Sequence, residues 1–181
     1  MPNTYGQIVL VNTKKGFIPS AIKWFTGSKF SHSLVIMPDM FDTRLCIEAV
    51  EGGVNMVGFD TEYSKNQNVG YEVYSINVDQ KSMDKALELL IKDLEIGYGF
   101  LAYPWFIYRR IGTFFGIDMK KHDNWFHSGI ICSQLCTYYL QQCGLSDLFA
   151  DYGDGSVSPQ DLKTIIISRP DIFKLTDSVR M

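Results

Sequence analysis

The chain has 181 residues, of which 46% are hydrophobic and 20% charged, and its formal net charge is −3. These values are ordinary for a globular protein, and they predict a single domain over residues 1–181 with a sizeable buried core. Lys and Arg form no run of five or more, which argues against nucleic-acid binding through a basic patch.

The first half of the chain reads as β-rich. Short runs of apolar, β-branched and aromatic residues predict strands over 7–11, 33–37, 45–50, 54–57 and 69–78. After the first of these, apolar residues at helical spacing predict a short helix over 17–25, with Pro19 near its start.

The second half reads as mostly helical. Apolar periodicity predicts helices over 82–96, with Ser82 as N-cap and Gly97 as stop, and over 104–115 and 130–143. A last short helix begins at Pro159 with Ser158 as its N-cap, and residues 164–167 fit either its end or a strand. Together these elements predict the α+β class.

Cys132 is the one cysteine of four expected at a helix start. A helix N-terminus and a nearby histidine both favour the thiolate, which is the nucleophilic form of cysteine. The other cysteines, Cys46, Cys136 and Cys143, fit small core residues, and their spacing predicts no disulfide framework.

His32 precedes one predicted strand, and Glu48 lies within the next. The short connection between them favours an antiparallel hairpin. Side chains alternate along a strand with a period of two, so a register that pairs even with even numbers would put both on one face. A register shifted by one residue would separate them. The even-to-even register would allow the Glu48 carboxylate, the His32 imidazole and the Cys132 thiol to lie in a row.

Five short motifs occur in a fixed order along the chain. They are the strand Tyr5-Gly6-Gln7-Ile8-Val9, then Phe30-Ser31-His32, Ile47-Glu48-Ala49, Cys132-Ser133-Gln134-Leu135 and Ser158-Pro159-Gln160-Asp161-Leu162. In this order the chain resembles the permuted papain-like cysteine hydrolases of the NlpC superfamily, YiiX-like branch. The likeness covers residues 5–162.

The resemblance implies a circularly permuted papain-like fold, with a small antiparallel β-barrel or curved sheet packed on helices. It implies Cys132 as nucleophile, His32 as base and Glu48 as the group that orients the histidine, with no metal or organic cofactor. The expected reaction is amide hydrolysis through a thioacyl intermediate, with cell-wall peptides (peptidoglycan) as one substrate class. A lipid acyl ester or thioester hydrolase or acyltransferase, and a binding module with an idle triad, are the alternatives.

Residues 1–6 show no secretory signal, and no apolar run of 18 or more residues predicts a transmembrane helix. We therefore expect a cytoplasmic protein, or a phage protein that is carried by the virion or released on lysis. The oligomeric state is not indicated.

Two departures from the family pattern concern the substrate pocket. Gln7 replaces the usual acidic residue, and the family's G-x-x-Y-D segment is blurred to Gly97-Tyr98-Gly99-Phe100. Tyr98 is the candidate substrate-binding residue.

Other interpretations of the same residues stay open. His127 is an alternative base, and an Arg or Lys partner would give Glu48 a structural role. The Cys-x-x-x-Cys spacing of Cys132 and Cys136 is not a usual zinc pattern. The aromatic run 98–108 fits core, a substrate groove or a membrane-surface face.

Overall fold

The computed structural model describes residues 4–14, 16–92, 94, 96–99, 103–124 and 129–179. The first half contains β1 (Ile8–Thr13), α1 (Phe17–Thr26), β2 (His32–Ile36), β3 (Leu45–Val50), β4 (Gly53–Gly58), the π-helical turn η1 (Asp60–Ser64) and β5 (Val69–Ile76). The second half contains α2 (Gln80–Lys92), α3 (Tyr103–Phe114), α4 (Cys132–Gln142), the short 3-10 helix η3 (Ser146–Phe149), α5 (Pro159–Ser168) and β6 (Phe173–Val179).

The strands form one six-stranded antiparallel sheet in the order β4-β3-β2-β1-β5-β6. The predicted α+β class is therefore confirmed. Of the two expected forms, a β-barrel or a curved sheet packed on helices, the barrel is wrong, because closure would need the two outer strands to pair. Here β4 and β6 are the edges of an open sheet packed against helices.

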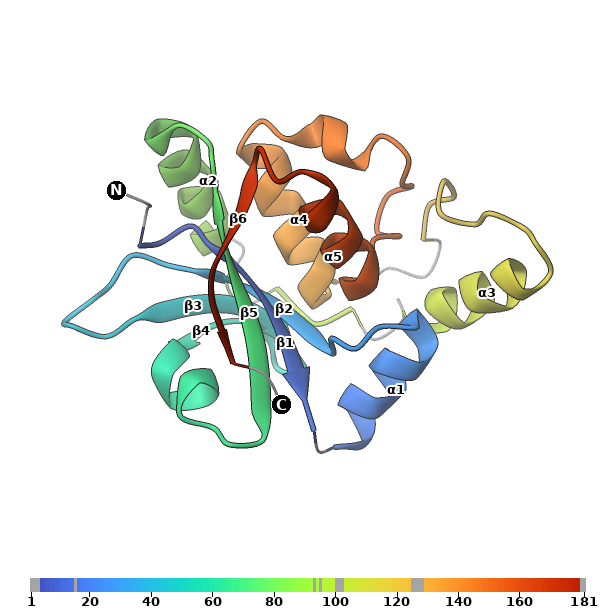
Figure 1. Ribbon diagram of the computed structural model, residues 1–181, viewed down its shortest axis with the longest axis horizontal. Helices are drawn as coiled ribbons and strands as arrows, with labels where there is room; N and C mark the ends of the chain where they lie inside the picture. Colours follow the sequence, from blue (N-terminus) through green and yellow to red (C-terminus); the bar gives the residue numbers. More distant parts are fainter. Residues whose placement is uncertain are drawn as a thin grey trace.

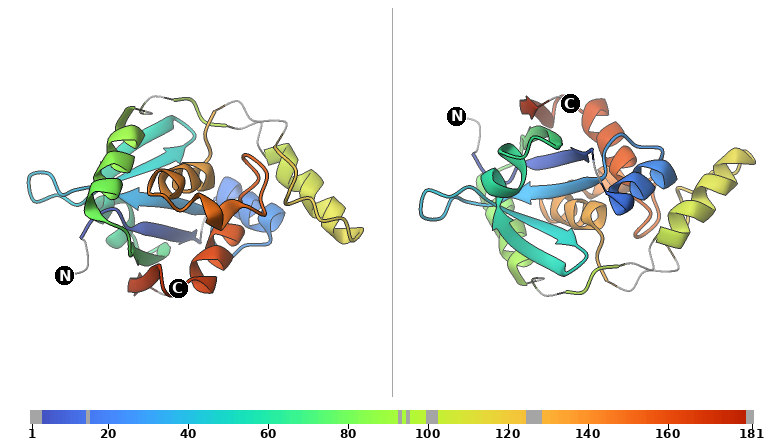
Figure 2. Two further views of the ribbon diagram at one scale, coloured as in Figure 1. Left: turned by 90° about the horizontal axis from the view of Figure 1, so that it is seen from above. Right: turned by 90° about the horizontal axis from the view of Figure 1, so that it is seen from below.

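Each face of the sheet has its own apolar cluster, as the alternation of side chains along a strand requires. On one face, Ile8, Leu10, Val35 and Ile47 pack with residues of α2, α4 and α5. These helices lie together on that side in Figure 1. On the other face, Val9, Val11, Leu34 and Ile36 pack with Phe59 and Tyr63, next to and within η1. α1 and α3 lie beyond one end of the sheet (Figure 2).

Several element boundaries differ from those expected. α2 begins at Gln80 and ends at Lys92, and the Asp79 carboxylate accepts a hydrogen bond from the Ser82 N–H at 2.9 Å, so Ser82 lies inside the helix. The Ser158 N-cap of α5 is confirmed, since its hydroxyl accepts from the Asp161 N–H. Residues 164–167 are helical. The edge strand β6 was not predicted.

Aromatic residues of α3 divide between core and surface. Trp105 and Phe106 are buried, whereas Tyr108 is exposed. The core interpretation of this run is thus confirmed for the first two and wrong for Tyr108. No helix within the described part of the chain combines the length and apolar character that a membrane crossing needs.

Candidate active site

The pairing of β2 with β3 brings His32 and Glu48 together. Leu34 lies opposite Glu48 in this antiparallel pair, so even-numbered residues face even-numbered ones. His32 is two residues before Leu34, which makes it a diagonal neighbour of Glu48 on the same face. The register expected from the sequence is therefore confirmed.

The imidazole and the carboxylate meet in a nearly dry environment. His32 Nε2 lies 2.8 Å from Glu48 Oε2, and the two side chains expose 13% and 7% of their surface. The Tyr63 hydroxyl donates a second hydrogen bond to the same carboxylate oxygen. The Tyr63 ring also stacks near His32, with centroids 6.2 Å apart and planes at 18°. Glu48 is thus held by two partners, and neither is the Arg or Lys considered from the sequence.

Cys132 is the first residue of α4, whose N-cap is Ile131 in an extended conformation. The Gln134 side chain accepts a hydrogen bond from the Ile131 N–H at 3.0 Å and so fixes where the chain enters the helix. α4 packs against β2, and Cys132 and His32 lie close enough for each to shift the pKa of the other.

The pKa values of these groups shift in opposite directions. Burial alone would raise the pKa of the Cys132 thiol, but the positive charge of His32, together with the nearby polar groups of Ser33, lowers it. Burial alone would lower the pKa of His32, but Cys132 and Glu48 raise it. The pKa of Glu48 is lowered because hydrogen bonds from His32 and Tyr63 outweigh its burial. A thiolate beside an imidazolium is therefore the favoured state.

The remaining thiols behave in the opposite way. Burial raises the pKa of Cys46 and Cys136, and it raises the pKa of Cys143 to about 11. All three stay protonated at neutral pH and pack as small core residues, as expected. Only Cys132, among the four, combines a lowered pKa with a place at a helix N-terminus.

A narrow slot adjoins the sulfur. Its lining is mostly apolar and comprises Ile22, Thr26, Tyr98, Phe106, Ile131, Cys132, Ser133 and Pro159. It leaves about 10 Å³ of free space, close to the minimum that holds one water molecule. Cys132 itself exposes 3% of its surface. A substrate must therefore displace side chains of the slot to reach the sulfur.

Tyr98 lies beside Cys132 because its segment pairs with the one before α4. Tyr98 and Ile130 form a parallel bridge, with the Gly99 N–H donating to the Ile130 carbonyl and the Ile130 N–H donating to the Gly97 carbonyl, both at 3.2 Å. Gly129 has φ +113°, and a Cβ there would lie 2.3 Å from the Gly97 oxygen, so the close approach requires glycine. A role for Tyr98 in substrate binding stays a prediction.

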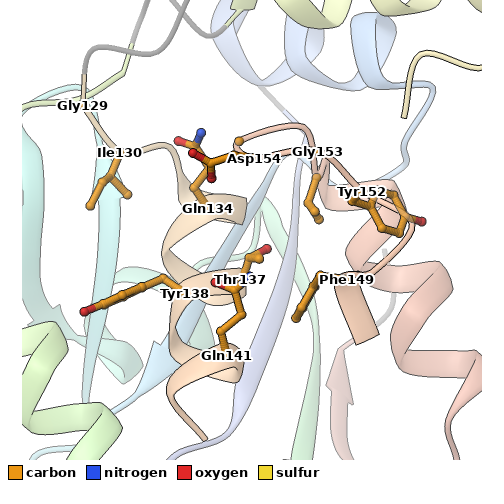
Figure 3. A pocket seen from close by; sticks show the side chains of 12 residues that line it. Gly129, Ile130, Gln134, Thr137, Tyr138, Gln141, Phe149, Tyr152, Gly153 and Asp154 are labelled. Atoms are coloured by element: carbon orange, nitrogen blue, oxygen red, sulfur yellow. The ribbon is translucent and has the colours of Figure 1, made fainter. Parts of the chain in front are cut away.

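A wider groove of about 540 Å³ lies along another side of α4 and is separate from the triad. Figure 3 shows Gln134, Thr137 and Gln141 of α4 on one side of it and Phe149 and Tyr152 on the other. Cys132 is not part of its lining.

Sequence patterns missed two residues that contact the candidate triad. Tyr63 sits on a π-helical turn, which has no apolar periodicity to reveal it. Ser33 lies on β2 next to His32, and its buried hydroxyl, without a hydrogen-bond partner of normal geometry, lies near Cys132 and Cys136 and favours their charged forms. Its proximity to His32 in the sequence was the only available signal. His127, the alternative base, lies outside the described residues.

Comparisons with known proteins relate the chain to one described fold. No family model matches it, and no curated protein sequence is significantly similar. Among solved structures, the crystal structure of YiiX from Escherichia coli O157:H7, described as a metalloprotein, matches with a TM-score of 0.55 and 17% identity. The match covers 99% of this chain and 98% of that one. The chain therefore has a YiiX-like fold.

Proposed function

We propose that this YiiX-like chain is a cysteine hydrolase whose nucleophile is Cys132, with His32 as base and Glu48 as the orienting carboxylate. The observation that carries the proposal is the buried thiol, imidazole and carboxylate chain, in which the pKa of the thiol is lowered while those of Cys46, Cys136 and Cys143 are raised. In papain-like enzymes the cysteine precedes the histidine in sequence. Here it follows, and we infer a single permuted papain-like domain of the NlpC superfamily.

The proposed reaction is amide hydrolysis in two steps. The Cys132 thiolate attacks the carbonyl carbon, and the oxyanion of the tetrahedral intermediate accepts from the Cys132 N–H, a first-turn amide that has no acceptor within the helix. The C–N bond breaks as the His32 imidazolium gives its proton to the leaving amine, and a thioester remains. His32 then takes a proton from water, the hydroxide adds to the thioester, and the carboxylic acid leaves as the thiolate returns.

A metal ion does not fit this arrangement, although the similar YiiX structure is described as a metalloprotein. His32 Nε2 and Glu48 Oε2 lie 2.8 Å apart and bind each other, and the Tyr63 hydroxyl occupies the same carboxylate oxygen, so these atoms are engaged in hydrogen bonds. Among the described residues, no group of three or more His, Cys, Asp and Glu side chains is arranged to hold a metal. No step of the proposed reaction uses one.

A second candidate is hydrolysis or transfer of an acyl ester or thioester. The residues that line the slot beside the sulfur favour it, because Ile22, Phe106 and Pro159 would offer an apolar surface to a hydrocarbon chain once a substrate displaces their side chains. Cell-wall peptides as substrates rest on the sequence resemblance alone.

Thiol labelling tests the nucleophile directly. Iodoacetamide at neutral pH should alkylate Cys132 faster than Cys136, and only the Cys132 rate should hold as the pH falls toward about 6, since an ordinary thiol is mostly protonated there. Peptide mapping by mass spectrometry assigns the sites. Equal, slow labelling of all cysteines with the same pH dependence would favour the idle binding module.

Matched variants then test turnover. Cys132→Ala should abolish cleavage of a panel of acyl amides, cell-wall peptides and acyl esters, whereas Cys136→Ala, one turn along the same buried face, should retain it. The substrates cleaved separate amide from ester hydrolysis. Full activity of Cys132→Ala would remove the nucleophile assignment.

A further inference from the structure

A second pocket lies next to the slot, between α3 and the beginning of α5. It has a volume of about 450 Å³, and three cationic side chains, Arg109, Arg110 and Lys120, line it together with one carboxylate, Asp161. We call it the basic pocket. Its excess of positive charge stands out in a chain whose formal net charge is −3.

One carboxylate does not balance the three cations. Arg109 binds Asp161 through both guanidinium nitrogens, at 2.8 and 2.9 Å, and this pair is largely buried. Lys120 lies farther from the same carboxylate, at 3.9 Å, with 48% of its side chain exposed. No carboxylate of the described residues lies within ion-pair distance of Arg110. The basic pocket therefore keeps positive charge for a ligand.

Arg110 is exposed, but its guanidinium is held by a neighbouring ring. Its guanidinium lies over the Trp24 ring at 5.2 Å from the centroid, and a Cβ on Gly27 would be 3.3 Å from its Nη1. A cation near the C-terminus of α1 stabilises that helix, which is sufficient reason for Arg110 alone. It does not account for Lys120, which comes from the loop after α3 and lines the same pocket.

The basic pocket and the slot are neighbours. Thr26 and Phe106 line both, and Ser158 of the basic pocket immediately precedes Pro159 of the slot. A molecule with its carbonyl carbon at Cys132 can therefore run past the Phe106 ring and place its other end among the cations. The surface between the two ends is apolar at Phe106 and polar at Thr26.

We propose that the basic pocket binds an anionic group of the substrate, a carboxylate or a phosphate, joined to the scissile carbonyl by a short apolar segment. This rests on the proposed function, because it takes Cys132 as the site of reaction. The basic pocket then selects substrates by charge, while the triad performs the same chemistry on any acyl group that reaches it.

Affinity labels with one warhead and different ends test this charge selection. N-substituted iodoacetamides of graded length would end in a carboxylate, a phosphate monoester or a neutral methyl amide. At one length, an anionic end should speed alkylation of Cys132 about two- to fivefold over the neutral probe, which is the upper part of the range for an exposed ion pair. Added salt and inorganic phosphate should reduce this preference. The faster anionic probe identifies the group bound.

Charge-removing variants locate the effect. Arg110→Gln and Lys120→Gln should each reduce the ratio of the anionic-probe rate to the neutral-probe rate. Lys121→Gln is the matched control, because that side chain is 67% exposed and pairs with Asp151 outside the basic pocket. Lys120→Gln alters a half-exposed side chain, so it remains informative if Arg110→Gln disturbs the contact between α1 and α3.

The outcomes separate the two proposals. Rapid alkylation of Cys132 at equal rates by all probes would overturn the basic pocket as an anion site and leave the proposed function standing. A preference that persists in both charge-removing variants would overturn it as well. Failure of every probe to react with Cys132 would overturn the proposed function, and the inference with it.

Discussion

Replacing Glu48 with Gln removes the negative charge of the candidate triad while keeping the shape of the side chain. The amide oxygen of Gln can still accept hydrogen bonds from His32 and Tyr63, so the side chains can stay where they are. What disappears is the negative charge that stabilises the imidazolium. The variant should fold and should keep the pair of Cys132 thiolate and His32 imidazolium, but only over a narrower pH range.

The size of the effect follows from the contact. His32 Nε2 and Glu48 Oε2 are 2.8 Å apart, with only 13% and 7% of their side chains exposed. An opposite charge this close changes a pKa by about one to three units, or ~1.4–4 kcal/mol. Glu48 raises the pKa of His32, so its loss should move the alkaline limb of reactivity, where the imidazolium loses its proton, down by that amount. The acid limb should move little, because His32 and Ser33 are what lower the pKa of Cys132.

The assay is the rate of amide hydrolysis as a function of pH, because breakage of the C–N bond needs the His32 imidazolium as proton donor, whereas alkylation needs only the thiolate. Glu62→Gln is the matched control, since it makes the same change at an exposed carboxylate in the same turn as Tyr63. An alkaline limb that stays in place in Glu48→Gln would show that the carboxylate does not support the imidazolium, and the pairing would then be only structural.

Two further changes test the surroundings of the triad. Tyr63→Phe keeps the ring beside His32 but removes the O–H donor to Glu48. It should lower the free energy of unfolding in urea by about 1.5–3 kcal/mol at neutral pH. An unchanged urea midpoint would contradict the hydrogen bond between Tyr63 and Glu48. Asp161→Asn leaves Arg109 without its charge partner and should cost about 3–5 kcal/mol at neutral pH. The folded pKa of Asp161 is lowered, so its stabilisation is present above the ordinary carboxyl pKa of about 4 and is lost as the pH falls through the folded value. The difference in unfolding free energy between Asp161→Asn and the wild type should therefore shrink in acid. A difference that stays constant would refute a stabilising Asp161 carboxylate.

Local patterns sufficed for the pairing of His32 with Glu48, because parity along two strands fixes which residues share a face. They did not suffice where a side chain depends on distant elements. Tyr63 comes from an irregular turn, and the slot combines Ile22 of α1, Phe106 of α3 and Pro159 of α5, whose relative positions no local spacing encodes.

The edge of the sheet was missed for a different reason. β6 buries only Phe173 and exposes the remaining residues, so it lacks the apolar alternation that marks a strand. Polar side chains on an outer strand discourage pairing with other chains. Sequence patterns also left open whether the strands form a barrel or an open sheet. Closure depends on whether the two outer strands pair with each other, which the residues of each strand do not indicate.

The separation of Cys132 from His32 and Ser33 along the chain has a consequence for biosynthesis. In a growing polypeptide, the serine and the histidine are made about a hundred residues before the sulfur they will tune, and until α4 settles on β2 that sulfur is an ordinary thiol. The chain would thus pass through synthesis with four chemically equivalent cysteines and acquire a reactive one only on reaching its native topology. For the same reason, the rate at which Cys132 is alkylated would report when the chain reaches its native fold.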